Sequence, residues 1–162
     1  MKTYEIRLIQ PQDNPALKDI IHMVMPEFGA GGPGFAIHDP EVEAMFEKYS
    51  QSRHAYFVVM REGRVLGGAG LAPLEGVDEP ICELQKMYFL PELRGSGAAA
   101  DLLAICLQKA KELGFQSCYI ETLKNMSAAQ KLYLKSGFEY IPESMGRTGH
   151  FGCNTFLLKS LV

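Results

Sequence analysis

The chain has 162 residues, of which 47% are hydrophobic and 22% charged, and its formal net charge is −3. This size and composition predict one domain over residues 1–162 with a real core, and the acidic balance argues against a nucleic acid as a partner. No apolar run is long enough to span a membrane, and the first residues lack the apolar segment of a signal peptide, so we expect a cytoplasmic protein with no membrane partner. The cysteines are widely spaced, which favours reduced thiols over a disulfide framework or a metal site; they are Cys82, Cys106, Cys118 and Cys153.

The first half of the chain contains strand-like and helix-like hydrophobic patterns separated by turn signals. Alternating apolar residues predict strands, and apolar residues at helical spacing behind an Asx-Pro pair predict helices. In chain order we expect a strand over 4–9, a helix opened by Asn14-Pro15, a mobile glycine-rich loop at 28–34, a helix opened by Asp39-Pro40, a hairpin over 55–72 that turns at Glu62-Gly63, and a strand over 81–90.

The second half predicts the remaining elements of an α/β domain. The complete order, β-α-α-β-β-β-α-β-α-β-β, indicates a mixed sheet in one layer with helices on both faces. The elements are a helix over 98–113 that ends before Gly114, a strand over 117–123, a short helix with a capping box at Ser127 and Gln130 that stops at Gly137, and strands over 138–141 and 154–158.

The segment Leu93–Ala99 joins the strand over 81–90 to the helix over 98–113 and contains Gly95 and Gly97. Unpaired N–H groups in the first turn of a helix, together with the helix dipole, favour a bound anion, and glycines let a phosphate approach the backbone. Glycines around a serine often form only a turn, so this segment indicates an anion site only together with the surrounding elements.

With the order of the elements, this turn resembles the GNAT (GCN5-related N-acetyltransferase) superfamily. The cofactor motif of that family, Gln or Arg followed by spaced small residues, is matched by Arg94, Gly97 and Ala99. Its C-terminal motif is matched at Ala129, Leu132, Tyr133, Gly137 and Phe138.

The resemblance covers nearly the whole chain, with one departure from the family pattern. The asparagine usually found three residues before the alanine of the second motif is replaced by Met126, and Asn125 lies one position earlier. The segments Cys82–Tyr88 and Thr148–Phe151 resemble a bacterial branch of mostly uncharacterised members.

The resemblance implies a mostly antiparallel sheet whose fourth and fifth strands splay apart, and acetyl-CoA as cosubstrate without a metal. The diphosphate would bind the turn, the pantetheine arm would lie along the splayed strand, and the N–H of Met87 would face the thioester oxygen. The implied cofactor-binding residues are Met87, Tyr88, Phe89, Arg94, Gly95, Ser96, Gly97, Ala98, Ala99 and Asn125.

Three residues are candidates for proton transfer. Tyr133 matches the general acid that the family places beside the thiol, although a tyrosine there could also be a core residue. Glu83 stands where some acetyltransferases of histones carry a base, and strand periodicity places it on one face with Gln85 and Met87. A glutamate paired with Lys86 or facing solvent is the alternative for Glu83.

His150 is the other candidate for the base, because its pKa is naturally near neutrality and its loop precedes the last strand. Its spacing from Cys153 does not by itself make a metal site.

The resemblance therefore implies an enzyme that moves an acetyl group from acetyl-CoA to a primary amine of a small molecule or an amino acid, by direct attack in a ternary complex. A non-catalytic acyl-CoA sensor and an acetyltransferase acting on a protein amine are the alternatives, and a homodimer formed through sheet edges is left open. A nucleotide-binding domain is disfavoured because the chain has no phosphate-loop lysine motif.

Overall fold

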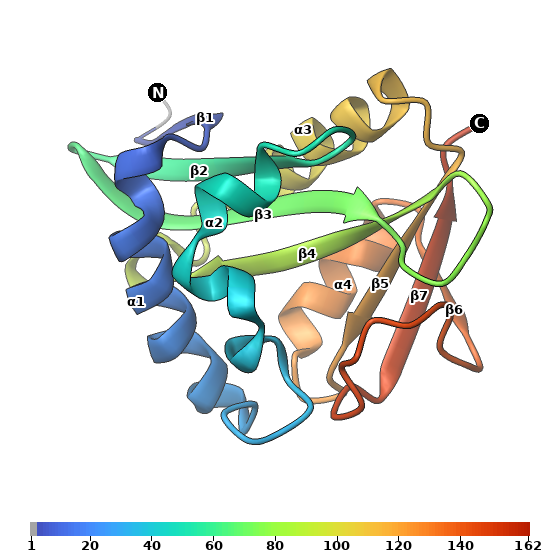
Figure 1. Ribbon diagram of the computed structural model, residues 1–162. Coiled ribbons are helices and arrows are strands. Elements are labelled where there is room, and N and C mark those ends of the chain that lie inside the picture. The colour runs from blue at the N-terminus through green and yellow to red at the C-terminus, as the bar shows by residue number, and fades with distance from the viewer. Residues whose placement is uncertain (1–2) are drawn as a thin grey trace.

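A computed structural model describes residues 3–162 and contains one continuous sheet of seven strands in the order β1-β2-β3-β4-β5-β7-β6 (Figure 1). All neighbouring strands are antiparallel except β4 and β5, which are parallel. This is the mixed, mostly antiparallel sheet that the sequence resemblance implied. The strands are β1 (Glu5–Leu8), β2 (Ala55–Arg61), β3 (Arg64–Pro73), β4 (Ile81–Phe89), β5 (Ser117–Thr122), β6 (Glu139–Ile141) and β7 (Thr155–Ser160).

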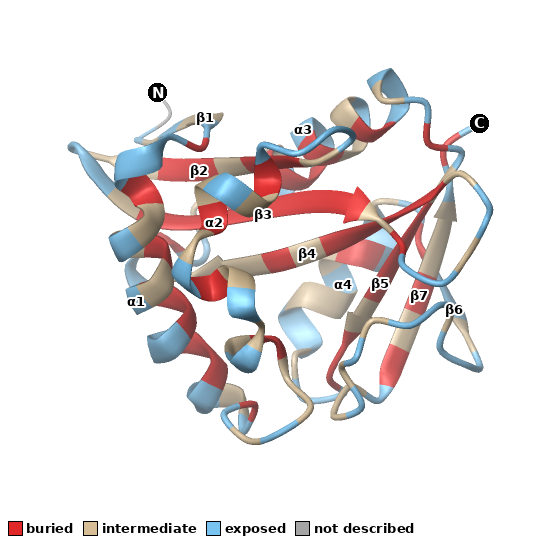
Figure 2. Ribbon diagram, in the orientation of Figure 1, coloured by how far each residue is buried: buried red, intermediate tan, exposed pale blue. Residues whose placement is uncertain are grey.

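Helices cover both faces of the sheet, as predicted. The helices α1 (Asn14–Val24) and α2 (Met45–Tyr49) lie on one face, and α3 (Ala98–Glu112) and α4 (Ser127–Lys135) lie on the other (Figure 1). Buried residues are concentrated on the central strands and on the side of α1 that faces them (Figure 2). Among residues 3–162, no helix combines the length and the apolar character needed to cross a membrane.

The structure differs from the expected helix starts at three places. Asn14 is the first residue of α1, and its amide oxygen accepts a hydrogen bond from the backbone N–H of Phe46. The helix expected after Asp39-Pro40 is divided, because Ala44 has non-helical dihedral angles between a 3-10 turn and α2.

The capping box predicted at Ser127 and Gln130 is absent. Ser127 lies inside the first turn of α4, and Met126 occupies the cap position without a side-chain hydrogen bond. The Gln130 amide instead donates to the carbonyl oxygens of Leu123 and Lys124 at 2.6 and 3.2 Å. It therefore fastens α4 to the end of β5.

The parallel strands β4 and β5 splay apart as implied, since they pair only at three positions, from Ile81 opposite Ser117 to Glu83 opposite Tyr119. The continuation of β4 beyond Glu83 has no strand partner on that side among the described residues. This unpaired edge is where the candidate site lies.

A bulge in β4 changes which side chains share a face. Gly68 of β3 pairs with Tyr88 and Gly70 pairs with Gln85, so both Lys86 and Met87 lie opposite one residue, and Lys86 has φ +50°. The extra residue breaks the period of two.

The expectation that Glu83, Gln85 and Met87 share one face is therefore wrong. Gln85 is hydrogen-bonded to Tyr49 of α2, whereas the sulfur of Met87 contacts the hydroxyl of Tyr133 of α4.

The bulge is held in place by Tyr56 of β2, whose hydroxyl donates to the carbonyl oxygen of Lys86 at 2.7 Å. The ring of Tyr56 fits because position 68 is a glycine: a Cβ there would lie 2.5 Å from Tyr56 Cε1. The side chain of Tyr56 on β2 and the absence of a side chain at Gly68 on β3 thus determine the shape of β4 at the site.

Candidate active site

The turn before α3 forms an uncapped helix start. Gly95 and Gly97 have φ values of +75° and +88°, which non-glycine residues rarely adopt. Gly97 is the cap residue of α3, and no side chain bonds to the cap position. Ser96 Oγ donates to the carbonyl of Leu93 at 2.6 Å and accepts from the N–H of Ala98 at 3.3 Å. The N–H groups that follow in the first turn are therefore available to an anion.

A cavity of about 360 Å³, which we call the large cavity, opens in front of this turn. Its walls come from the end of α1, the splayed end of β4, the start of α3, and α4. Its lining includes Val24, Phe28, Met87, Tyr88, Phe89, Leu93, Arg94, Gly95, Gly97, Ala99, Met126, Ala129, Leu132 and Tyr133.

Three of the predicted cofactor-binding residues lie outside this lining. Ser96 supports the turn, the side chain of Ala98 is buried in the core, and Asn125 donates its amide to the carbonyl oxygen of Phe28 at 2.9 Å. The others, Met87, Tyr88, Phe89, Arg94, Gly95, Gly97 and Ala99, line the cavity.

Arg94 has protein partners in the structure. Its guanidinium bonds the carboxylate of Glu27 at 2.9 and 3.2 Å and the carbonyl oxygen of Phe89 at 3.0 and 3.2 Å. Arg94 thereby connects the turn to the end of β4 and to the segment after α1.

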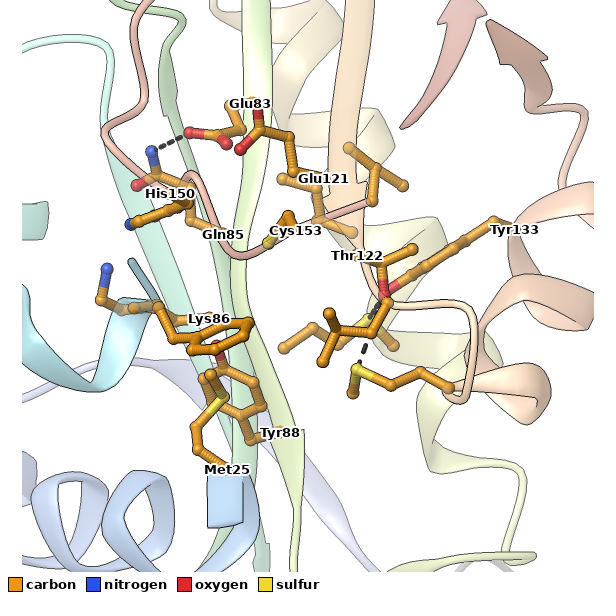
Figure 3. A pocket seen from close by; sticks show the side chains of 17 residues that line it. Met25, Glu83, Gln85, Lys86, Tyr88, Glu121, Thr122, Tyr133, His150 and Cys153 are labelled. Carbon is orange, nitrogen blue, oxygen red and sulfur yellow. Dashed lines mark hydrogen bonds between the residues drawn. The ribbon is translucent and has the colours of Figure 1, made fainter. Parts of the chain in front are cut away.

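Figure 3 shows a second, smaller cavity of about 70 Å³, which we call the inner cavity. Four residues line both cavities: Met87, Tyr88, Met126 and Tyr133. The polar lining of the inner cavity comes from both splayed strands and from the loop before β7. This lining includes Glu83, Gln85, Lys86, Glu121, Thr122, His150 and Cys153.

Glu83 is buried in the wall of the inner cavity, with 5% of its surface exposed. Burial raises the pKa of Glu83 to about 7; the Gln85 hydrogen bond opposes this rise and the charge of Glu121 adds to it. The Gln85 amide donates to Glu83 Oε1 at 2.6 Å and is itself fixed by the hydroxyl of Tyr49 at 2.8 Å. Glu83 can therefore gain or lose a proton near neutral pH.

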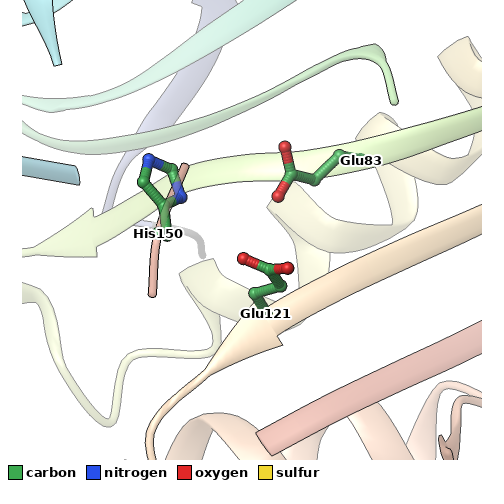
Figure 4. Close-up of side chains that lie close together, drawn as sticks. All are labelled: Glu83, Glu121 and His150. Carbon is green, nitrogen blue, oxygen red and sulfur yellow. The ribbon is translucent and has the colours of Figure 1, made fainter. Parts of the chain in front are cut away.

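Glu121 of β5 faces Glu83 across the gap between the strands (Figure 4). Its two oxygens accept hydrogen bonds from the hydroxyls of Tyr119 and Thr148 at 2.7 and 2.6 Å. Ligand atoms of Glu83, Glu121 and His150 all lie within 4.8 Å of one another. The sequence pattern did not identify Glu121. It could have been found from its position on the strand over 117–123, which is expected next to the strand that carries Glu83.

His150 is brought to the site by an ion pair that spans 111 positions of the chain. Its Nε2 lies 2.8 and 3.0 Å from the oxygens of Asp39. Burial lowers the pKa of His150, but the hydrogen bond and charge of Asp39 outweigh it, and the net pKa is raised. Cys153 lines the same cavity but is not part of the cluster formed by Glu83, Glu121 and His150.

Lys86 does not pair with Glu83, as one alternative supposed. Its side chain is 2% exposed, and its Nζ lies 2.8 Å from Asp39 and 3.2 Å from Glu41. Since Glu83 is buried, the solvent-facing alternative for this residue is also wrong.

Tyr133 of α4 lines both cavities, and in Figure 3 its side chain points into the inner one. Its hydroxyl has a weak contact, 3.8 Å, with Met87 Sδ. Burial raises the pKa of Tyr133, so the hydroxyl keeps its proton at neutral pH. Although the ring packs beside Phe138, the hydroxyl end borders a cavity and can act as a donor there.

Comparison with known proteins agrees with this architecture. Residues 17–138 match the profile of the acetyltransferase (GNAT) family. The chain is 44% identical over 157 residues to the uncharacterized N-acetyltransferase YjgM of Escherichia coli strain K12, covering 96% of this chain and 94% of the relative. It is also 30% identical over 131 residues to an uncharacterized N-acetyltransferase of Schizosaccharomyces pombe, covering 80% and 78%.

Solved structures share the fold at low sequence identity. An acetyltransferase of the GNAT family from Staphylococcus aureus superposes with a TM-score of 0.84 at 19% identity, covering 98% of this chain and 99% of the other. The putative acetyltransferase yncA from Salmonella typhimurium, solved with acetyl-CoA, superposes with a TM-score of 0.80 at 18% identity, covering 99% and 95%. The chain therefore belongs to the acetyltransferase (GNAT) family, as the sequence resemblance indicated, and is an acetyl-CoA-dependent N-acetyltransferase.

Proposed function

We propose that this protein, acting as one domain over residues 1–162, transfers the acetyl group of acetyl-CoA to a primary amine of a small molecule by direct attack in a ternary complex. The observation that carries the proposal is the junction of the two cavities. One cavity contains the uncapped start of α3, the other contains the buried Glu83, and Met87, Tyr88, Met126 and Tyr133 border both. Cofactor and acceptor can thus enter from different sides and meet at these four residues.

The large cavity suits the cofactor. The N–H groups from Gly95 to Ala99, apart from that of Ala98, which is bonded to Ser96 Oγ, would bind the diphosphate. The pantetheine arm would lie along the unpaired edge of β4 near Met87–Phe89. A backbone N–H at Met87 that faces the thioester oxygen would stabilise the charge developing there, a contribution often worth about 3 kcal/mol. The acetyl-CoA in the fold relative from Salmonella typhimurium supports this assignment.

The inner cavity supplies the base. Glu83 would take a proton from the incoming ammonium, directly or through water, so that the free amine attacks the thioester carbon. The tetrahedral intermediate collapses by breaking the carbon–sulfur bond, and Tyr133 would give its proton to the departing thiolate. The nitrogen loses its second proton as the amide forms, and this proton, passed through water, would restore the hydroxyl of Tyr133, while the first proton leaves Glu83 for solvent. The products are the acetylated amine and free coenzyme A.

Glu83 is preferred to His150 as the base because of what each residue is paired with. Nε2 of His150 is engaged by Asp39, whose hydrogen bond and charge outweigh burial and raise the pKa of His150, so this ring nitrogen already has a partner. Glu83 accepts one hydrogen bond from Gln85 and has a pKa of about 7, which matches a base that works near neutrality.

The test is the release of free thiol from acetyl-CoA in the presence of a panel of primary amines. We expect amine-dependent release by the parent protein, and much slower release by Glu83→Gln and by Tyr133→Phe. Calorimetry with acetyl-CoA provides the companion measurement. Tight binding without amine-dependent thiol release would contradict the proposal and identify an acyl-CoA sensor. Release with a protein amine but with no small amine would assign the activity to a protein acceptor.

A further inference from the structure

We propose that the acceptor is a cationic amine that carries no carboxylate on the carbon bearing its amino group. This inference rests on the proposed function, because it concerns the molecule that would occupy the inner cavity. It divides small primary amines into two classes, simple alkyl or aryl amines and α-amino acids, and it assigns the enzyme to the first class.

The inner cavity and the groups directly behind it are dominated by negative charge. Glu83 and Glu121 line the cavity, and Asp39 and Glu41 lie behind Lys86 and His150. Four carboxylates thus face one ammonium and one imidazole. An ammonium is attracted into such a space, and a second anion brought within it meets like charges at close range.

Each of the two cations already has an anionic partner. Lys86 Nζ is bonded to both Asp39 and Glu41, and Nε2 of His150 is bonded to Asp39. Arg147, an exposed residue, lines a more open cavity that shares Glu121 and His150 with the inner one, but it does not line the inner cavity. Among residues 3–162, the inner cavity therefore offers no uncommitted cation to a carboxylate.

Covalent geometry keeps an α-carboxylate in the inner cavity. Two bonds separate the amino nitrogen from the carboxyl carbon, so the carboxylate oxygens lie within about 4 Å of the reacting nitrogen. An amine within reach of Glu83 would then place that carboxylate beside Glu83 and Glu121, whose ligand atoms lie within 4.8 Å of each other. A carboxylate farther along the molecule escapes this repulsion.

An ammonium group, in contrast, fits the hydrogen bonds that remain. Each carboxylate can accept about four hydrogen bonds. Glu121 accepts one at each oxygen, from Tyr119 and Thr148, and Glu83 accepts one from Gln85. Both carboxylates therefore keep acceptor capacity for the three donors of an ammonium, and the hydroxyls of Tyr119 and Thr148 hold Glu121 in position.

The experiment compares amines with the amino acids from which they differ by one carboxylate: ethanolamine with serine, 3-methylbutylamine with leucine, and histamine with histidine. For each pair, kcat/KM is measured by thiol release at saturating acetyl-CoA. We expect the best amine to exceed its amino acid by on the order of a hundredfold or more, the scale that like charges about 4 Å apart impose near a protein surface.

The variant Glu121→Gln tests the cause of the preference. It should lower kcat/KM for the amine and reduce the ratio within the pair to roughly tenfold or less, because one of the two facing charges is gone. Its affinity for acetyl-CoA should equal that of the parent, since Glu121 does not line the large cavity. Glu139→Gln, which removes a charge from an exposed residue of β6, is the matched control and should keep the parent ratio.

The outcomes separate the two proposals. Acetylation of amino acids at rates equal to or above those of their amines would overturn the inference and leave the transferase assignment intact. An unchanged ratio in Glu121→Gln would also overturn it, because the charge would then not set the preference. Binding of acetyl-CoA with no transfer to any amine or amino acid would overturn the proposed function, and the inference with it.

Discussion

Replacing Glu83 by glutamine should separate activity from stability, because the same buried carboxyl affects both. In the parent we expect kcat/KM to rise with pH through about 7 as Glu83 loses its proton. The variant should lack this rise and be slower by on the order of 10²- to 10³-fold above pH 7.5. Below pH 6 the parent's carboxyl is itself protonated, and the difference between the two proteins should shrink.

The effect on stability has the opposite direction. An ordinary glutamate has a pKa of 4.5, and the folded-state pKa of Glu83 is about 7, so the folded protein holds this proton more tightly than the unfolded chain. The stability from this carboxyl is fully present below pH 4.5 and is lost as the pH rises through 7. The whole difference corresponds to about 3 kcal/mol, which makes Glu83 a cost to the fold at pH 8.

Urea denaturation at pH 5 and pH 8 measures this cost. Glutamine carries no charge at either pH, so the variant should be close to the parent in its free energy of unfolding at pH 5 and more stable by up to about 3 kcal/mol at pH 8. Equal differences at both pH values would refute the buried ionisation. A pH profile of activity that the substitution leaves unchanged would refute Glu83 as the base and direct attention to His150.

Three further predictions concern Tyr133, the glycine turn before α3 and the bulge in β4. Tyr133→Phe should lower kcat on the order of 10²-fold in steady-state kinetics with little change in acetyl-CoA affinity, and an unaltered kcat would exclude the general acid. Gly97 and Gly114 have φ values of +88° and +86°, so replacing either by alanine should lower the free energy of unfolding by about 1–2 kcal/mol. Calorimetry should show weaker acetyl-CoA binding for Gly97→Ala only. Equal losses of affinity in both variants would contradict the anion site. Tyr56→Phe leaves the carbonyl oxygen of Lys86 without its hydrogen-bond donor, so urea unfolding should show a free energy of unfolding lower by about 1–3 kcal/mol. Steady-state kinetics should show a lower kcat. Full activity would show that the bulge does not need this bond.

Local patterns in the sequence were sufficient for the element order and for the glycine turn before α3. The hairpin turns at Glu62-Gly63 and α3 ends at Glu112, before Gly114, as expected. Both features were predictable because a turn or a helix end depends on a few neighbouring residues. The turn at Gly97 and the place of Tyr133 followed from two short motifs.

The polar lining of the inner cavity depends on contacts between distant segments, which no local pattern contains. Asp39 reaches His150 across 111 positions, and Glu121 becomes a neighbour of Glu83 only when β5 is set parallel to β4. The period of two failed at Lys86 because the bulge there is supported by Tyr56, which belongs to another strand.

Because the ladder between β4 and β5 is short, these strands are held together less firmly than β2 and β3 are. Three residue pairs join these strands, whereas seven join β2 to β3, so the sheet has a weak seam at the place where the reaction would occur. A pantetheine arm lying in the gap would close that seam from inside. At a concentration one hundred times its dissociation constant, a ligand that binds only the native state raises the free energy of unfolding by about 2.7 kcal/mol. Binding of the cofactor would then also stabilise the strands that line the inner cavity. Without cofactor, β4 and β5 would separate more easily than β2 and β3.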